Sequence, residues 1–465
     1  MNRIVGLSVL AGMILSGCVR YHPRPISPEE TASRLENRSL KNSELQRFVR
    51  QNLGEGATNS AEIVWNFDAL LLAAFYYHPS LEEARDQWRI AQAEVKTAGG
   101  RPNPSVSVLP EYNFTPSSGM SPWLPAITID WPVETAGKRG YRIARSEHLS
   151  EAARLNIAAA AWQVRGKLRS AMLQVAGARR REVLLEGQFA SQEQLVNLLS
   201  QRLRAGAISS VELAPPRLAL AKTRMDLIDA KRRKAEAWAG LAEATGVNVG
   251  ALNEIDVVTE VSNPSPMGRE LVSTELRGQA LRSRTDVLAS LAEYEASQSA
   301  LQLEIAKQYP DIHIGTGYQW DEGGNKWQLG VTAEIPVLNR NEGPIAEAEA
   351  RRKLAGTKLQ TLQTGIIADL DRAVESFRAA EKDLAALEEL ASLQKTQLEQ
   401  AQAQVRAGAA DQVDLLNAQV EFHTGELTRV EVLIKANETL INLENAVQRP
   451  MDLPRVNPSI EVNAR

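Results

Sequence analysis

The sequence contains one cysteine among 465 residues, and only 5% of its residues are aromatic. One cysteine excludes a disulfide framework and a cysteine-based zinc site. The charges nearly balance, with 53 Lys and Arg against 57 Asp and Glu, whereas nucleic-acid-binding proteins usually carry a strong basic excess. Since 43% of the residues are nevertheless apolar, we expect long helices with thin apolar seams rather than thick globular cores.

Catalytic motifs are missing as well. The sequence has no HExxH motif, phosphate-binding loop or catalytic-triad spacing. The five histidines show no metal-ligand spacing and are expected at the surface, in loops or in helix seams: His22, His78, His148, His313 and His423. The sequence therefore predicts neither an enzyme nor a bound metal.

The amino terminus carries one short apolar run. Residues 4–15 follow Arg3 and are too few for a membrane-spanning helix of ~20 residues, but they fit the apolar region of a secretory signal. The run ends in Leu15-Ser16-Gly17-Cys18, which resembles the bacterial lipobox. We predict a signal peptide at 1–17 and a covalent lipid on Cys18 as the only attached group. A plain signal peptide followed by an incidental thiol is the alternative.

Both ends of the mature chain are polar. Residues 18–60 are rich in proline and lack an apolar period, so they are predicted to form a lipidated N-terminal tether with a short helix near Ser43–Asn52. Residues 450–465 are predicted to form a similar C-terminal tail. Because Val19, not an aspartate, follows Cys18, the outer membrane is the expected location of the anchor.

The sequence between these ends repeats itself. Arg204-Ala205-Gly206-Ala207 recurs as Arg406-Ala407-Gly408-Ala409, and Trp131-Pro132-Val133 recurs as Ile335-Pro336-Val337, each roughly 200 residues later and in the same order. Two unrelated Ala-rich helices would not share these Pro and Gly landmarks. We predict a tandem duplication, with the first repeat at 61–262 and the second at 263–449.

Each repeat reads as a helix, two strands, a long helix, a glycine turn and a returning helix. The strands are expected at residues 105–110 and 126–131, and again from residue 312 onward and over 327–335. Aromatic residues flank the strand loops, as in a membrane-interface girdle: Tyr112, Phe114, Trp123, Tyr318, Trp320 and Trp327. In the first repeat, Pro215 and Pro216 predict a late start or a kink in the returning helix.

The long helices carry sustained heptad seams. Apolar residues from Ile366 to Val405 are spaced by three and four, and the pattern resumes from Val413 to Ile441. Such seams predict helices packed side by side at a shallow angle. A run of ~60 residues is ~90 Å long at 1.5 Å per residue, which is unusual for a globular enzyme.

Open sheet edges make a demand on these elements. Only closed barrels place strands in hydrocarbon, because an unpaired edge there is strongly unfavourable. The smallest usual barrel has about eight strands, so four strands per chain predict that several chains share one barrel. Heptad helices arranged in a ring would continue it as a conduit.

These features together resemble the TolC family of outer-membrane efflux factors. The resemblance rests on the duplicated halves, the strand ends at Trp131-Pro132-Val133 and Ile335-Pro336-Val337, and the Arg-Ala-Gly turns followed by Val-acidic-Leu. It covers roughly residues 67–448. The lipobox resembles the lipoprotein branch, and residues 134–139, Glu-Thr-Ala-Gly-Lys-Arg, resemble the CzcC-like cation-efflux members.

The resemblance implies a mainly α-helical fold with a small membrane β-barrel portion. Tandem-duplicated long α-hairpins of a homotrimer would form an α-barrel tunnel, and four strands per chain would enter a shared twelve-stranded β-barrel. The protein would be the outer-membrane exit duct of a tripartite efflux system, a passive conduit for metal cations or other small molecules. Its partners would be a periplasmic membrane-fusion adaptor and an inner-membrane pump of the RND type.

The resemblance also assigns candidate residues. Asp414 and its counterpart Glu212 would line the periplasmic aperture, although each could equally be an acidic residue in a helical first turn. The turns that would meet the adaptor comprise Arg204, Ala205, Gly206, Ala207, Arg406, Ala407, Gly408 and Ala409. The competing hypothesis is a periplasmic coiled-coil lipoprotein that tethers envelope layers, which would need no aromatic-flanked strands.

Overall fold

The computed structural model describes residues 20–53, 63–259, 263, 273–321 and 323–451. The predicted signal peptide, Cys18 and nearly all of the predicted tail lie outside these residues. The predicted repeat boundary at residues 262 and 263 borders segments outside the description, and it stays a prediction.

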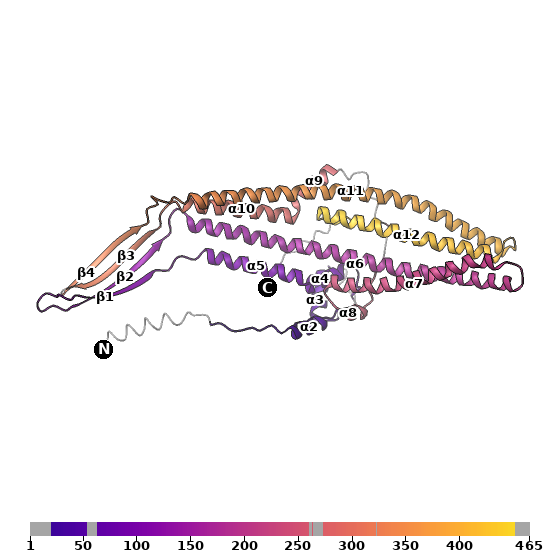
Figure 1. Cartoon of the computed structure of the whole chain (residues 1–465), viewed down its shortest axis with the longest axis horizontal. Helices are drawn as coiled ribbons and strands as arrows, with labels where there is room; N and C mark the ends of the chain where they lie inside the picture. The colour runs from indigo at the N-terminus through magenta and orange to yellow at the C-terminus, as the bar shows by residue number, and fades with distance from the viewer. Residues whose placement is uncertain (1–19, 54–62, 260–262, 264–272, 322, 452–465) are drawn as a thin grey trace.

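The molecule is elongated, with four strands at one end and, at the other, the two tight turns that connect α6 to α7 and α11 to α12 (Figure 1). Helices α6 (Lys138–Arg204) and α11 (Glu342–Arg406) run the whole way from the strands to those turns. They contain 67 and 65 residues, which at 1.5 Å per residue is about 100 Å. The sequence-based expectation of unusually long helices is therefore confirmed.

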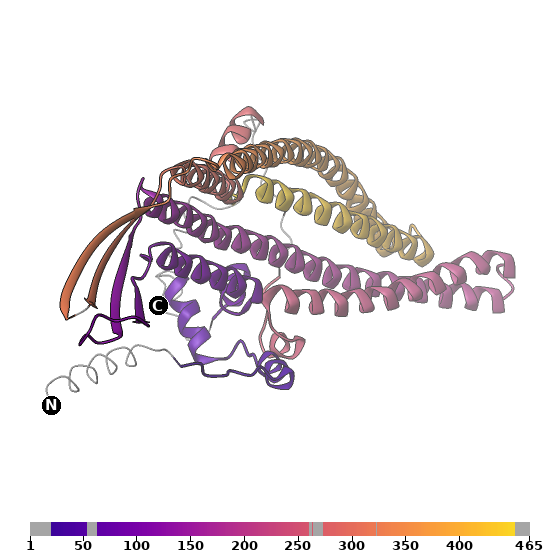
Figure 2. The same cartoon turned by 60° about the vertical axis from the view of Figure 1, so that its left-hand side comes forward.

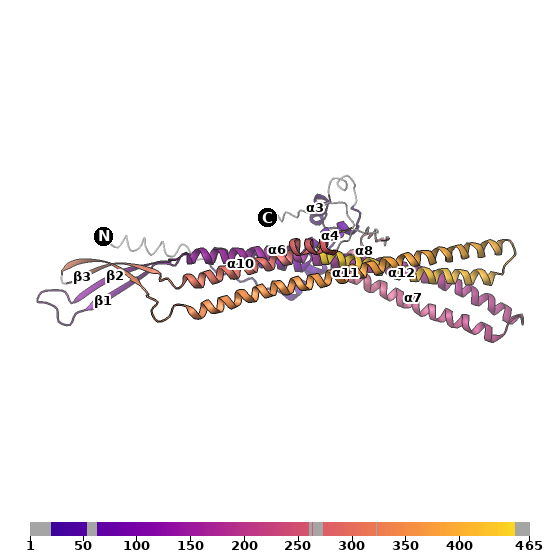
Figure 3. The same cartoon turned by 90° about the horizontal axis from the view of Figure 1, so that it is seen from above.

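Shorter helices pair with these two. On the strand side, α5 (Pro79–Ala98) packs along α6, and α10 (Thr285–Ala306) packs along both α6 and α11. Toward the far turns, α7 (Ser210–Thr245) and α12 (Gln412–Val447) return along α6 and α11. Since α12 also packs on α6, the two hairpins run side by side (Figure 3).

The heptad seam of α11 is buried as its spacing predicts. Leu370 and Phe377 are fully buried, and Ile366, Ala373, Ala380 and Leu384 are at most 8% exposed. Toward the turn the seam is only half-buried, as at Leu398 and Val405. Burial of such a seam stabilises a long helix that would be marginal by itself.

Glycines of α6 lie where α12 packs closely. A Cβ built on Gly177 would clash with the Ile434 side chain, and one built on Gly187 would lie 2.6 Å from the His423 ring. A larger residue at either position would require the α12 side chain to move.

The four strands form one antiparallel sheet of order β1-β2-β3-β4. The strands are β1 (Ser105–Tyr112), β2 (Trp123–Val133), β3 (Ile312–Asp321) and β4 (Gly324–Ala333). The first pair extends beyond the predicted 105–110 and 126–131. Strand β4 begins before the predicted residue 327 and ends at Ala333 rather than 335, so Ile335-Pro336-Val337 lies beyond its end. The strands gain these residues because the flanking aromatics belong to the ladder, where Tyr112 pairs with Trp123 and Tyr318 with Trp327.

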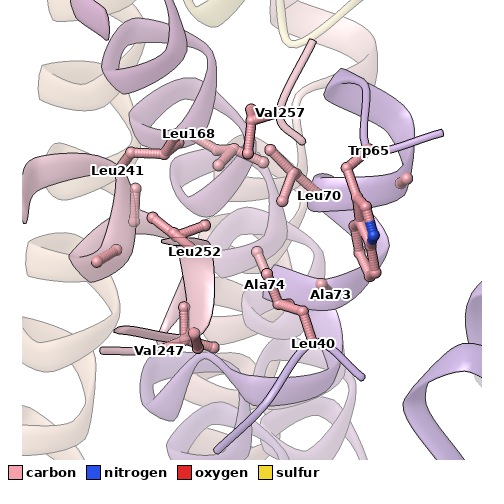
Figure 4. Close-up of a cluster of buried hydrophobic side chains, with 14 of the residues drawn as sticks. Leu40, Trp65, Leu70, Ala73, Ala74, Leu168, Leu241, Val247, Leu252 and Val257 are labelled. Carbon is pink, nitrogen blue, oxygen red and sulfur yellow. The ribbon is translucent and has the colours of Figure 1, made fainter. Parts of the chain in front are cut away.

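A belt of small helices lies on one side of the molecule, beside the middle of α6 and the C-terminal end of α7 (Figure 2). It comprises α2 (Pro28–Glu36), α3 (Ser43–Asn52), α4 (Phe67–Tyr77) and α8 (Val249–Asn253), whereas α9 (Ser273–Ser283) packs on α11. Figure 4 shows Leu40, Leu70 and Trp65 converging with Leu168, Leu241 and Leu252 on one buried cluster.

The described part of the predicted tether is therefore not an extended tether. The helix predicted at Ser43–Asn52 is present, but Leu40, Leu45 and Val49 are fully buried against α4 and its neighbours. Two N-caps position the belt helices: Ser27 accepts a hydrogen bond from the Glu30 amide, and Asn42 from the Glu44 amide. The proline-rich composition predicted an extended segment, but three of its apolar side chains pack against the helices of the first repeat.

Of the two alternatives predicted for Pro215 and Pro216, the late start is wrong and the kink stays a prediction. Helix α7 begins at Ser210, so it does not start late, and both prolines lie inside it. Ser209 and Glu212 form a capping box at its start, and this fixes the first turn before the missing amides are needed.

A buried ion cluster joins the two repeats. Glu444 of α12 is fully buried and accepts hydrogen bonds from Arg165, at 3.0 Å, and from Arg169, both on α6. Its other oxygen accepts the Met451 amide at 2.8 Å. Burial alone would raise the pKa of Glu444, but the two guanidinium groups outweigh it and the pKa lies below its usual value.

We predict that Glu444→Gln destabilises the protein by about 3–5 kcal/mol, because it leaves the buried Arg165 and the partly buried Arg169 without this carboxylate. The check is thermal or denaturant unfolding of the purified protein. The control is Glu438→Gln, whose carboxylate meets only Gln174 at the surface and whose loss should change stability by about 0.5 kcal/mol or less. Equal losses in the two variants would contradict a central role for the cluster.

Candidate functional site

The sheet has one apolar and one polar face. Strand residues alternate between faces, and the register gathers most apolar side chains on one face and most polar ones on the other. The apolar face carries Val106, Val108, Tyr112, Trp123, Ile127, Ile129, Trp131, Val133, Ile312, Ile314, Tyr318, Trp320, Trp327, Leu329 and Val331, together with the polar Thr316 and Asn325. The polar face carries Ser105, Ser107, Glu111, Thr128, Asp130, His313, Gly315, Gly317, Gln319, Lys326, Gln328, Gly330 and Thr332, together with the apolar Leu109, Leu124, Ala126 and Pro132.

On the inner strands β2 and β3 the apolar face is the more exposed one, whereas the outer strands β1 and β4 are exposed on both faces. Trp327 is 81% exposed, Leu329 75% and Val331 69%, whereas Asp130 and His313 opposite are half-buried. A sheet folded in water shows the reverse arrangement. Strands of 8 to 11 residues with apolar residues outward and polar residues inward are the pattern of a transmembrane barrel wall.

Aromatic rings lie on the apolar face at the end of the sheet remote from the helices. Tyr112 packs edge-on against Trp123 with ring centroids 5.1 Å apart, and Tyr318 lies 5.1 Å from Trp327. Amphipathic rings at this level fit a membrane–water interface. Trp131, near the helical end, is 50% exposed on the same face.

A network of side chains anchors the helices to the sheet. Lys138, only 7% exposed at the start of α6, donates hydrogen bonds to the Tyr309 carbonyl at 2.6 Å and to Asp311 at 2.7 Å. The Thr135 amide donates to the same Asp311 oxygen at 2.9 Å. Burial would raise the pKa of Asp311, but the hydrogen bonds from Lys138 and Thr135 hold it below its usual value.

The same segment reaches the end of α5. Arg139 donates to the Gly99 carbonyl at 2.8 Å, and Arg142 pairs with Glu134 while donating to the Gly100 carbonyl at 3.2 Å. The sequence Glu-Thr-Ala-Gly-Lys-Arg at 134–139 is thus a clasp between the sheet, α5 and the turn before β3. Its role here is structural, and Gly137 supports it with a φ of 74°.

At the opposite end, both turns have the same design. Gly206 and Gly408 adopt φ values of 73° and 70°, which glycine tolerates best. The Ala207 amide bonds the Arg202 carbonyl at 2.9 Å, and the Ala409 amide bonds the Gln404 carbonyl at 2.8 Å. These bonds satisfy the last carbonyls of α6 and α11 in Schellman motifs.

The turn residues are largely exposed. The exposed set is Arg204, Ala205, Gly206, Ala207, Arg406, Ala407, Gly408 and Ala409. The duplicated sequence therefore produces two matching exposed turns side by side at one end. Their contact with an adaptor stays a prediction.

Glu212 and Asp414 lie in matching capping boxes. A Glu212 carboxylate oxygen accepts the Ser209 amide at 3.0 Å and the Ser209 hydroxyl at 2.7 Å, and these bonds lower the pKa of Glu212. Asp414 accepts the Asp411 amide at 3.2 Å. Each carboxylate thus serves its own helix start, the alternative left open above, and the place of either residue at an aperture stays a prediction.

Asp411 makes the ion pair that sequence inspection missed. Its carboxylate pairs with Arg202, so the end of α6 is joined to the start of α12. The hydrogen bond from Arg202 lowers the pKa of Asp411. The sequence could hardly predict this ion pair, since Arg202 and Asp411 belong to different hairpins. The only local indication is that Asp411 is an acidic residue at the N-cap of α12.

Two features are absent from the described part of the chain. No helix there is both long and apolar enough to cross a bilayer. No cluster of three or more His, Cys, Asp or Glu side chains there is arranged to hold a metal ion. The predicted lipid attachment at Cys18 lies outside the described residues.

A sheet with an exposed apolar face, continuous with long paired helices, defines the class of outer-membrane channel components with helical extensions. The family model for outer membrane efflux proteins matches residues 73–247 and 276–447. The chain belongs to this family, and the predicted resemblance to TolC-type efflux factors is confirmed.

Curated relatives include two metal-resistance proteins. The chain is 28% identical over 260 residues to the cobalt-zinc-cadmium resistance protein CzcC of Cupriavidus metallidurans, covering 53% of this chain and 57% of CzcC. It is 26% identical to the nickel-cobalt-cadmium resistance protein NccC of Alcaligenes xylosoxydans, covering 68% of this chain and 71% of NccC. The outer membrane protein OprJ of Pseudomonas aeruginosa is 24% identical, with 65% of this chain and 63% of OprJ covered.

Coverage differs between sequence and structure. The matched part of the chain spans less than two thirds of the length of CzcC and of OprJ. The solved structure of the outer-membrane channel OprN matches with a TM-score of 0.67 at 16% identity, covering 93% of this chain and 99% of OprN. This likeness confirms the predicted fold class of long helices with a four-stranded barrel portion.

We predict that the contact between the two turns depends on Asp411 rather than Asp414. Spin labels at Ala207→Cys and Ala409→Cys, in a Cys18→Ser background, would report the distance between turns by pulsed electron paramagnetic resonance. Asp411→Asn and Arg202→Gln should broaden the distance distribution at pH 7, because each removes the ion pair. Asp414→Asn, the matched control, should leave it narrow.

The same labels give a pH test. A lowered carboxyl pKa means that the contact is present above the ordinary Asp pKa of about 3.9 and is lost as the pH falls through the lowered value. In the parent, broadening should therefore appear only below about pH 4, whereas the distribution of Asp411→Asn should be broad already at pH 7 and should not change with pH. A transition near neutral pH, or equal broadening by Asp414→Asn, would contradict the assignment.

Proposed function

We propose that the chain is the outer-membrane exit duct of a tripartite efflux system and that it works as a homotrimer. The observation that carries this proposal is the four-stranded sheet, whose exposed apolar face and two free edges suit a shared barrel in hydrocarbon. The duct is passive, and an inner-membrane pump drives transport through it.

The sheet edges support assembly of several copies. Strands β1 and β4 are the outer strands of the sheet, and each leaves a row of backbone groups unmatched within the chain. Those groups are strongly unfavourable in a bilayer unless a further strand pairs with them. Four strands are too few to close alone, and three copies supply twelve, within the range of known outer-membrane barrels.

The helices make the same demand. Val211, Leu218 and Met225 of α7 recur every seven residues and are 77%, 74% and 72% exposed. They lie opposite the face that carries Leu213 and Ala230, which are 1% exposed where α7 packs on α6. On the other outer helix, Leu390 and Leu393 of α11 are 48% and 61% exposed. An α7 stripe packed on a neighbour's α11 would complete a ring of helices.

The ends of the molecule fit the partners of such a duct. The paired turns at Gly206 and Gly408 would meet a periplasmic membrane-fusion adaptor, itself bound to an RND-type pump. Asp414 and Glu212 lie one helical turn behind them, near the narrow end of the ring. A lipid on Cys18 would anchor the belt side of the molecule to the inner leaflet of the outer membrane, since acyl chains bind by burying methylenes at ~0.8 kcal/mol each.

Metal cations are the cargo that the comparisons favour. Both CzcC and NccC are named for resistance to metals such as cobalt and cadmium. Residues 134–139, which resemble the CzcC-like members, form the clasp at the sheet. OprJ carries no metal in its name, so small organic molecules are the second class of cargo. A tethering lipoprotein, the competing hypothesis, leaves the exposed apolar face of the sheet unexplained.

We predict that Leu218→Glu combined with Met225→Glu prevents trimer formation, because it places six carboxylates in the apolar contact of one trimer. Light scattering after size exclusion in detergent measures the mass, and planar bilayers measure conductance. The parent should be trimeric and form channels, whereas the double variant should be monomeric and silent.

The matched control is Arg217→Glu combined with Arg224→Glu, which introduces the same side chain at the preceding position of each heptad. These exposed positions lie beside the stripe, so this variant should remain a conducting trimer. A monomeric parent, or loss of the trimer in the control alone, would refute the assembly.

A further inference from the structure

The polar face of the sheet holds an imidazole–carboxylate pair near its helical end. Nδ1 of His313 on β3 lies 2.7 Å from Oδ2 of Asp130 on β2, and the two side chains are 43% and 40% exposed. An ionised carboxylate can only accept hydrogen bonds, so Nδ1 carries the hydrogen and donates it. A neutral ring in this tautomer presents the lone pair of Nε2, for which the described residues provide no hydrogen-bond partner.

The surroundings leave that nitrogen accessible. His313 stands across from Pro132 on β2 and Thr332 on β4. The next positions on the same face are Gly315 and Gly330, which pair with each other. A Cβ built on Gly315 would meet its nearest neighbour, the Gly330 carbonyl, at 3.8 Å, which is ordinary contact. Packing therefore does not require glycine there, and its absence of a side chain leaves space beside the imidazole.

The neighbouring charges favour a cation. Lys138 is paired with Asp311 at 2.7 Å, and Arg142 is paired with Glu134. These two positive charges thus each have a carboxylate of their own, and Arg139 bonds the Gly99 carbonyl. Asp130 bonds the His313 ring, and no Lys or Arg of the described residues pairs with it on the face that would line the lumen.

We propose that His313, oriented by Asp130, is a coordination site for divalent transition-metal cations passing through the barrel. The proposal rests on the trimeric duct proposed above, in which three such pairs would surround one axis. Metal-binding histidines commonly donate their second ring N–H to a carboxylate, which orients the ring and raises its basicity. Imidazole suits Zn²⁺ and Ni²⁺, whereas Mg²⁺ prefers oxygen ligands.

The site is built for passage rather than storage. One chain supplies one imidazole nitrogen, and the described residues of a single chain contain no cluster of three ligands. A conduit requires binding that is favourable enough to attract the ion and weak enough to release it. A single nitrogen per chain, with a carboxylate behind it, meets both conditions.

The experiment uses the full-length, untagged protein in planar bilayers with KCl as the carrier of current. NiCl₂ is added to one side, and MgCl₂ at the same concentration serves as the comparison ion. The parent should show brief, reversible Ni²⁺ blocks and no Mg²⁺ blocks. His313→Gln should raise the half-blocking Ni²⁺ concentration at least tenfold, and Asp130→Asn should raise it by about 10–100-fold as a lost orienting partner.

The matched control is His22→Gln, which removes an exposed histidine of the N-terminal segment and should block like the parent. Ni²⁺ blocks that persist unchanged in His313→Gln, or equal blocks by Mg²⁺, would overturn the proposal. Should His313→Gln fail to fold, Asp130→Asn alone decides, since an unchanged Ni²⁺ response in that variant also overturns it.

A second measurement separates this proposal from the duct itself. Isothermal titration of NiCl₂ into the detergent-purified full chain should show binding that His313→Gln abolishes and His22→Gln retains. Binding without channels would contradict the duct and keep the metal site. Channels in KCl with no His313-dependent binding would keep the duct and refute the site.

Discussion

A strand edge left unpaired in hydrocarbon is unfavourable by several kcal/mol for each exposed peptide group. The sheet of this chain has two such edges, on β1 and β4, and large apolar side chains such as Trp327 and Leu329 are exposed on one of its faces. Both properties make sense only where lipid replaces water and further strands continue the ladder. The sheet also sets the direction of α6, because the ion pair of Lys138 with Asp311 joins the start of this helix to the residue before β3.

The two repeats have the same order of elements but contribute different stabilising contacts. The first supplies the clasp and, with the N-terminal helices, the belt whose cluster includes Leu40, Leu168 and Leu241. The second supplies α12, whose Glu444 holds the repeats together through Arg165 and Arg169. At the end remote from the sheet, Arg202 of the first hairpin pairs with Asp411 of the second. The pair at the turns is exposed and therefore more sensitive to salt than the buried cluster around Glu444.

Sequence patterns predicted the elements with strong periods. The heptads of α11, the strand alternation at Ile312 and Ile314, and the glycine turns at Gly206 and Gly408 are local signals, and the structure follows them. The belt escaped prediction because Leu40, Leu45 and Val49 are buried by segments remote in sequence. For the same reason, spacing could not reveal the pairing of Arg202 with Asp411 or of Asp130 with His313, since each joins different strands or hairpins.

The most direct test of the shared barrel is cross-linking between its edge strands. Single cysteines at Ser105 or Ser107 on β1 would be combined with one at Gln328 or Thr332 on β4, in the Cys18→Ser background, and oxidised in intact outer membranes. All four positions lie on the polar face, and β1 and β4 are at opposite edges of the sheet. The account predicts a covalent trimer for the pairs in register and none for either single cysteine. Only monomers, for every pair, would contradict it.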